Sequence, residues 1–87
     1  MPKRDTTEVT LQINLLRGDP IRCKADVSEN QRRNLGTALE RAFASNYVGV
    51  ELGGKLILVP LANIQSVEIQ PAPGVLIRGV ARNTRPA

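Results

Sequence analysis

The apolar residues near the start of the chain alternate with polar ones. Every second residue from Val9 to Leu15 is Val, Leu or Ile, and the intervening residues are Thr, Gln and Asn. This period of two is typical of a β-strand with one buried face. The turn-forming stretch Arg17-Gly18-Asp19-Pro20 follows, and alternation resumes over residues 21–26. The pattern therefore predicts a β-hairpin at the beginning of the domain.

The period of the pattern changes at Ser28. Ser28 and Gln31 have the spacing of a capping box, in which each side chain accepts a hydrogen bond from the backbone N–H of the other residue. Asn46 then offers a stop, because Asn tolerates the left-handed conformation that ends many helices. The sequence predicts one amphipathic helix from about Glu29 to Ala44. Its apolar face would consist of residues at the helical three-and-four spacing: Leu35, Ala38, Leu39, Ala42 and Phe43.

The second half of the chain returns to strand-like patterns. The segment 47–52 alternates, Gly53-Gly54 permits a tight two-residue turn, and the segment 55–59 returns as a partner strand. Residues 60–63 break that strand. Residues 64–69 form the next predicted strand, with Val67 and Ile69 inward, and a last apolar stretch covers residues 75–80.

These elements predict an α+β fold with the order ββαβββ(β). Hairpins dominate, so we expect one mainly antiparallel sheet of five or six strands with the amphipathic helix packed on one face. A chain of 87 residues with 41% apolar content supports one small domain. We assign residues 7–80 to this domain, residues 1–6 to a flexible basic N-terminus and residues 81–87 to a flexible basic tail.

The later strands carry more apolar residues than one helix covers. In the segments 56–59 and 75–77 neighbouring apolar side chains point to both faces of the sheet. The second face would be covered either by closure of the sheet into a partial barrel or by a second copy of the chain. We favour a homodimer, whose contact residues would be Ile57, Val59, Val75, Leu76 and Ile77.

The net charge of +4 and the pI of about 10.0 raise nucleic-acid binding as an alternative. The excess lies at the two ends, since acidic and basic residues balance between positions 6 and 77. We therefore do not favour this alternative. Besides Lys3 and Arg4, its phosphate contacts would be Arg22, Lys24, Arg32, Arg33, Arg78, Arg82 and Arg85.

The composition argues against most catalytic and metal chemistry. The chain has no His, no Trp and one Cys, so it lacks the usual base partner of a nucleophile and the usual ligands of a zinc site. Cys23 alternates with apolar residues and is expected to be a small core residue. Glu51 and Glu68 could meet on one face of a single sheet as a carboxylate pair, but two solvated strand residues are the better interpretation. We expect no enzyme activity, no cofactor and no metal.

The sequence also indicates where the protein is located and whether a segment of it could span a membrane. One cysteine cannot form an internal disulfide and no signal segment opens the chain, so the cytoplasm is expected. The longest apolar run, residues 56–62, contains Pro60 and is too short to span a membrane.

Two local motifs remain. Gly49 and Gly54-Lys55 have part of the spacing of a phosphate-binding loop, but Leu56 stands where a Ser or Thr would hold magnesium, so a glycine turn is the better interpretation. Residues 56–69 resemble strand pairs of small barrels, including those of Sm-like and LytTR-type nucleic-acid binders. The pattern is generic, and we assign no family from it. The expected function is that of a non-enzymatic, self-associating protein-interaction or regulatory module whose partner protein is unknown.

Overall fold

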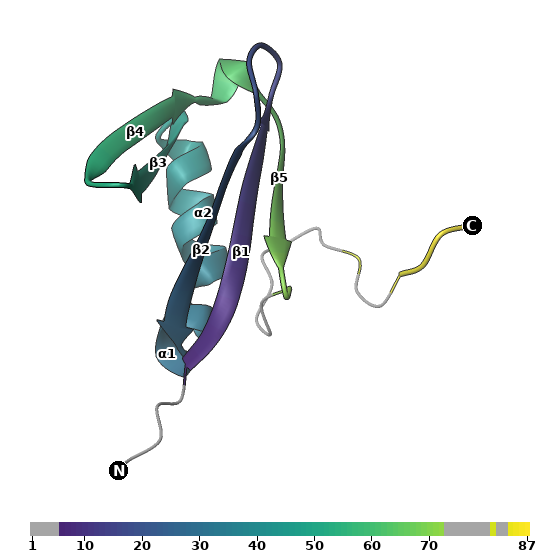
Figure 1. The fold of residues 1–87 in the computed structure, drawn as a ribbon. Coiled ribbons are helices and arrows are strands. Elements are labelled where there is room, and N and C mark those ends of the chain that lie inside the picture. Colours follow the sequence, from purple (N-terminus) through teal and green to yellow (C-terminus); the bar gives the residue numbers. More distant parts are fainter. Residues whose placement is uncertain (1–5, 73–80, 82–83) are drawn as a thin grey trace.

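The computed structural model describes residues 6–72, 81 and 84–87. The described chain is α+β, with antiparallel sheets and two short helices (Figure 1), which confirms the predicted class. The elements are β1 (Thr6–Leu15), β2 (Ile21–Ser28), α1 (Glu29–Arg33), α2 (Leu35–Ala44), β3 (Tyr47–Leu52), β4 (Lys55–Pro60), the 3₁₀ turn η1 (Leu61–Asn63) and β5 (Ile64–Gln70). The predicted last strand at residues 75–80 lies outside the described residues.

The strands form two sheets, and the prediction of one sheet of five or six strands was wrong. The larger sheet has the order β2-β1-β5, and β3 pairs only with β4. The chain leaves β4 through η1 and returns beside β1, so β5 adds to the first hairpin rather than to the second. Local patterns show where strands lie, but this choice of partner depends on contacts between residues far apart in the sequence.

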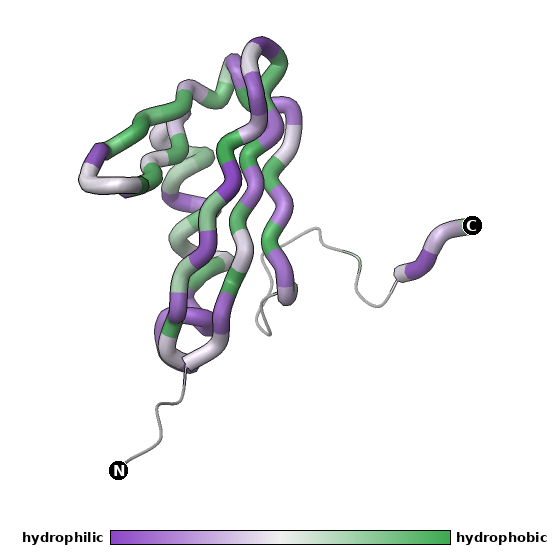
Figure 2. The backbone as a smooth tube through the Cα atoms, viewed as in Figure 1, coloured by the Kyte–Doolittle hydropathy of each residue, from purple (hydrophilic) through white to green (hydrophobic). Residues whose placement is uncertain are grey.

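The three-stranded sheet has one apolar and one polar face. Ile13 sits opposite Ile21 on β2 and opposite Val67 on β5, and its side chain is fully buried. Leu11, next on the same face, is paired with Cys23 and Ile69. The intervening residues are polar, as Figure 2 shows by the alternation of colours along these strands. The alternation predicted for this hairpin is therefore confirmed.

The turn between β1 and β2 is held by Asn63 at the end of η1. The Leu16 N–H donates to the Asn63 carbonyl at 2.8 Å, and the Arg17 N–H donates to Asn63 Oδ1 at 3.1 Å. Gly18 has a φ of 100°, a value that favours glycine in the turn. These contacts fix the point at which the first hairpin meets the segment leading into β5.

The predicted helix is present but is divided at Asn34. Ser28 caps α1 with the capping box expected from the sequence, the Gln31 N–H donating to Ser28 Oγ and the Ser28 N–H donating to Gln31 Oε1. Asn34 has a ψ near 0°, outside the helical range, and separates α1 from α2. Asn46 adopts the expected left-handed conformation, with a φ of 70°.

The second hairpin packs its inner face on α2 and on the larger sheet. Gly53 and Gly54, with φ of 60° and 78°, make the predicted two-residue turn. Val48 and Val50 of β3 join Ile13 in the buried core, and α2 packs against β3. The core therefore lies where β1, β3 and the end of α2 meet.

Candidate functional site

The outward face of the β3–β4 hairpin carries three of the six large apolar side chains that are exposed among the described residues. Residues opposite each other in the ladder share a face, so Tyr47 lies beside Pro60, Gly49 beside Leu58 and Glu51 beside Leu56. Leu56 is 70% exposed, Leu58 is 56% exposed and Tyr47 is 45% exposed. We call these six residues the hairpin outer face.

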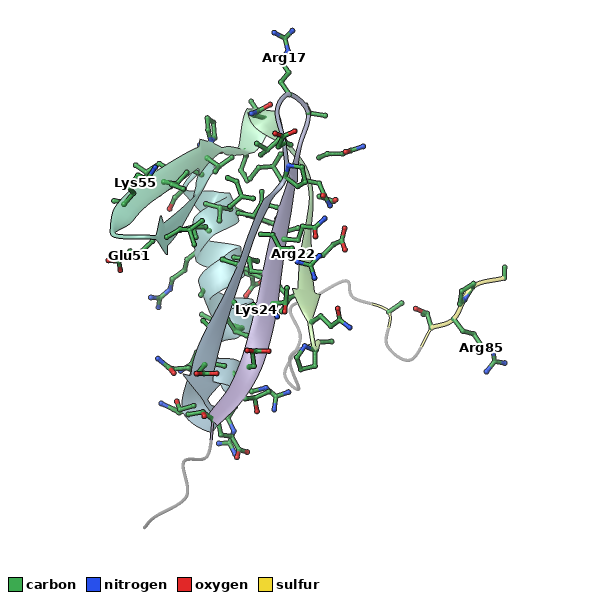
Figure 3. The ribbon with its side chains drawn as sticks, in the orientation of Figure 1. Arg17, Arg22, Lys24, Glu51, Lys55 and Arg85 are labelled. Carbon is green, nitrogen blue, oxygen red and sulfur yellow. The ribbon has the colours of Figure 1, made fainter. Side chains whose placement is uncertain are left out.

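Gly49 shapes this face by its lack of a side chain. A Cβ at Gly49 would lie 3.1 Å from Leu58 Cδ2 and 3.9 Å from Leu56 Cδ1. The Leu58 side chain therefore lies across the hairpin backbone instead of standing away from it. The hairpin outer face thus places the two leucines on the same side as one carboxylate, that of Glu51, whose position on β3 is labelled in Figure 3.

The residues that the sequence proposed for self-association occupy different positions. Val59 is 4% exposed and belongs to the core, while Ile57 is half-buried on the same inner face. The exposed neighbours are Leu56 and Leu58, on the other face of β4. Val75, Leu76 and Ile77 lie outside the described residues.

The direction of the β4 side chains could have been predicted from the sequence, through the pairing of β4 with β3. A two-residue turn at Gly53-Gly54 places Ile57 opposite Val50 and Val59 opposite Val48. Cross-strand partners share a face, so inward valines on β3 imply inward partners on β4. The inward direction of Ile57 and Val59 was not predicted, since β4 taken alone is apolar on both sides.

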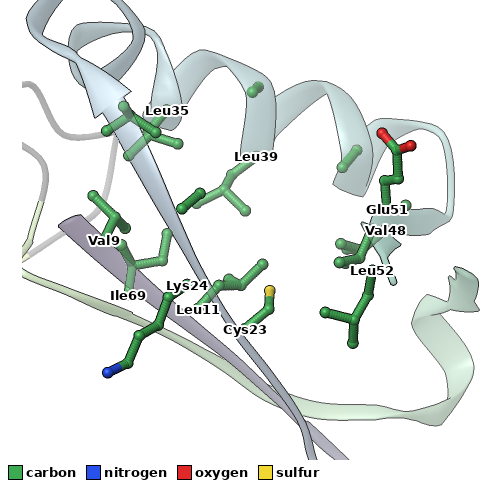
Figure 4. A pocket seen from close by; sticks show the side chains of 16 residues that line it. Val9, Leu11, Cys23, Lys24, Leu35, Leu39, Val48, Glu51, Leu52 and Ile69 are labelled. Atoms are coloured by element: carbon green, nitrogen blue, oxygen red, sulfur yellow. The ribbon is translucent and has the colours of Figure 1, made fainter. Parts of the chain in front are cut away.

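A second feature is an apolar cavity of about 370 Å³ between α2 and the larger sheet. Figure 4 shows Val9, Leu11 and Ile69 on the sheet side facing Leu35 and Leu39 on the helix side. Leu35 and Leu39 are only half-buried, so the predicted apolar face of the helix is incompletely covered. Phe43, also assigned to that face, is 41% exposed.

Cys23 lines this cavity and is half-buried. Its place between apolar neighbours agrees with the expected core role. Among the described residues no group of three or more His, Cys, Asp or Glu side chains could hold a metal ion.

The polar face of the larger sheet carries a chain of side-chain hydrogen bonds. Arg22 donates from Nη1 to Gln12 Oε1 at 3.0 Å, and Gln12 donates from Nε2 to Asn14 Oδ1 at 2.9 Å. Asn14 Nδ2 then donates to Ser66 Oγ at 2.9 Å and to Glu68 Oε2 at 2.7 Å. The network links β2, β1 and β5 on one surface.

The expected nucleic-acid contacts are dispersed in the part of the chain that the structure describes. Lys24, on the same sheet face as Arg22, has Glu8 at 3.9 Å, and Arg33 on α1 has Glu29 at 3.7 Å. Arg32 has its Nε buried without a hydrogen-bond partner. Arg85 lies in the C-terminal segment, away from Arg22 and Lys24 (Figure 3). Lys3, Arg4, Arg78 and Arg82 lie outside the described residues.

Glu51 and Glu68 do not form a carboxylate pair. Glu51 lies in β3 and Glu68 in β5, which belong to different sheets. Both are exposed strand residues, in agreement with the favoured interpretation, and the alternative of a pair depended on a single continuous sheet. Glu68 instead accepts a hydrogen bond from Asn14.

Two further findings complete the description. No helix among the described residues is long and apolar enough to cross a membrane. Comparison with protein-family models, with curated proteins and with solved structures finds no significant match.

Proposed function

We propose that this protein is a non-catalytic interaction module that associates with a second copy of itself through the β3–β4 hairpin. The observation that supports the proposal is the exposure of Leu56 and Leu58 side by side on the hairpin outer face. Contiguous apolar surface of this kind is typical of protein contacts. Removing each leucine from water would contribute about 2 kcal/mol.

The electrostatics of the surface favour another copy of the chain as partner. No charged residue lies between Lys55 and the end of β4, and Glu51 is the single charge on the hairpin outer face. A second hairpin can therefore lie beside this one with little repulsion between like charges. The proposed setting is the cytoplasm, because one cysteine provides no internal disulfide.

The stability of the module also favours a partner. An isolated two-stranded hairpin is marginally stable in water, and within the part of the chain that the structure describes β3–β4 gains its support from α2 and the core, on its inner face. A domain of this size has a small margin of stability. Contact of the hairpin with a second copy would therefore stabilise the fold as well as join two chains.

The proposal predicts that the double variant Leu56→Lys, Leu58→Lys is monomeric. Both side chains are exposed, so the change removes apolar contact and adds repulsion without altering the core. Sedimentation velocity of the purified variant and of the wild type at equal micromolar concentration is the measurement. We expect a weakening of association by about a hundredfold or more.

The matched control is Leu16→Lys, at a leucine that is 62% exposed in the turn between β1 and β2. The control should sediment as the wild type does, and all three proteins should have the same circular dichroism spectrum. A folded double-lysine variant that associates as strongly as the wild type would contradict the proposal.

A further inference from the structure

The β4 strand has a backbone edge to which no described residue is hydrogen-bonded. The Leu61 N–H donates to the Asn46 carbonyl at 3.0 Å, at the end of the β3–β4 ladder. Hydrogen-bonded and non-hydrogen-bonded pairs alternate in an antiparallel ladder, so Val59 and Ile57 direct their N–H and C=O groups toward β3. Leu58 and Leu56 direct theirs outward, at the free edge.

Pro60 agrees with this assignment. It has no N–H group, and its backbone nitrogen points away from β3, as those of Leu58 and Leu56 do. Proline is tolerated in a strand where its nitrogen faces away from the neighbouring strand. The free edge therefore offers hydrogen-bond donors at Leu56 and Leu58 and ends at Pro60.

The outer strands of the larger sheet have the charges that keep an edge unpaired. Along β2 the polar face carries Arg22, Lys24 and Asp26, and β5 carries Glu68. Charged residues of this kind discourage the addition of a further strand. By contrast, β4 reads Leu-Ile-Leu-Val between Lys55 and Pro60. Its composition favours pairing with another strand.

From this edge we infer how two copies join: β4 pairs antiparallel with β4 of a second copy, about a twofold axis at Ile57. The inference rests on the proposed self-association and specifies its contact. In this register Leu56 exchanges both backbone hydrogen bonds with Leu58 of the second copy, and Ile57 faces its own counterpart in a non-hydrogen-bonded pair. The strand order becomes β3-β4-β4-β3.

This register satisfies more backbone groups than the register with its axis at Leu58 does. If the axis passed through Leu58 instead, Leu56 would face Pro60 of the second copy, which has no N–H to donate to the Leu56 carbonyl. With the axis at Ile57, the N–H and C=O groups of Leu56 and Leu58 all find partners. The leucines of both copies also lie side by side on one face.

Pairing at the edge suits the charge of Glu51 better than face-to-face stacking does. In the four-stranded sheet Glu51 stays on the outer strand β3, in contact with water. Stacking two hairpin outer faces would place this carboxylate against apolar side chains, with a cost of desolvation. The contact is therefore made by strand addition.

Single cysteines test the register in a Cys23→Ala background, with oxidised glutathione as oxidant. Non-hydrogen-bonded partners have Cα atoms about 4.5 Å apart, within reach of a disulfide. Ile57→Cys should therefore form a covalent dimer on a denaturing gel. Leu58→Cys alone should cross-link at least about tenfold more slowly, since its counterpart lies diagonally across the pair.

The other outcomes of the cysteine test distinguish the β4–β4 register from the proposed self-association on which it rests. Rapid cross-linking of Leu58→Cys with none at Ile57→Cys would overturn the register, since it would indicate an axis at Leu58 or face-to-face stacking, while self-association itself would stand. A protein that is monomeric by sedimentation and cross-links at neither position would overturn both.

A backbone variant supplies a second test that does not depend on cysteine at a half-buried position. Leu58→Pro removes the outward N–H, whereas Leu58→Ala removes the side chain and keeps it. We expect Leu58→Pro to weaken association by roughly tenfold or more relative to Leu58→Ala, since a hydrogen bond is lost in each copy. Equal association of these two folded variants would contradict pairing at the edge.

Discussion

At the scale of single residues, Asn14 and Ile13 show how one strand serves two surfaces. Ile13 is fully buried between β2 and β5. Asn14, the next residue, faces the opposite side and donates to Ser66 and Glu68. Alternation along β1 predicted both directions from the sequence. The hydrogen-bond partners of Asn14 were not predicted, because they lie on β5, whose place beside β1 depends on contacts between distant residues.

The Asn14 contacts predict a charge-sensitive substitution. Asn14→Asp replaces a donor 2.7 Å from Glu68 Oε2 with a second carboxylate, which should lower the free energy of unfolding by about 1 to 2 kcal/mol at pH 7. Urea denaturation at pH 7 and pH 3 is the measurement. Because carboxylates become protonated below about pH 4, the loss in free energy of unfolding relative to the wild type should be smaller at pH 3 than at pH 7.

The control for this prediction is Asn14→Ala, which loses the same hydrogen bonds but adds no charge. Its deficit should be about the same at both pH values. If Asn14→Asp were as stable as the wild type at pH 7, the hydrogen bond from Asn14 to Glu68 would have no part in holding β5 to β1.

At the scale of elements, the local signals were reliable. The capping box at Ser28 and Gln31 and the glycine turn at Gly53-Gly54 are formed as the sequence predicts, since both depend on neighbouring residues. The division of the helix at Asn34 was not predicted. The sequence has no proline near Asn34 to mark it, and the nearby Gly36 lies inside α2. The Asn34 carbonyl accepts the first helical hydrogen bond of α2, from the Ala38 N–H at 2.9 Å.

The capping box predicts a measurable contribution of Ser28 to stability. Ser28→Ala leaves the Gln31 N–H without its acceptor and should lower the free energy of unfolding by about 1 kcal/mol. In a domain of this size the melting temperature should fall by about 4 to 8 °C. Thr37→Ala, at an exposed position of α2, is the matched control and should not lower it. Equal melting temperatures of the wild type and Ser28→Ala would show that the capping box does not contribute to the stability of the fold.

At the scale of the whole molecule, the main difference from expectation is the separation of the two sheets. The sequence indicates a surplus of apolar side chains in the second half of the chain, and the structure retains part of that surplus as Leu56 and Leu58 on the hairpin outer face. The side of β4 that carries it was not predicted from β4 alone, because this strand is apolar on both faces. Only its pairing with β3 assigns Val59 to the core and Leu58 to the exterior.

The separation of the sheets also accounts for the free edge of β4. In a single sheet of five strands β4 would have a neighbour on each side, and its edge would be satisfied within one chain. Here β5 pairs with β1 instead. The outer leucines and the outward backbone groups of β4 thus have the same origin. Pairing with β4 of a second copy would satisfy these backbone groups and bring the leucines of the two copies into contact on one face.

Sedimentation equilibrium of the unmodified protein tests this self-association most directly. Over a concentration series in the micromolar range, we expect the mass to rise from the 9.5 kDa of one chain toward twice that value. Because the contact is apolar, the rise should persist at high salt. A mass of 9.5 kDa at every concentration would contradict self-association through the β3–β4 hairpin.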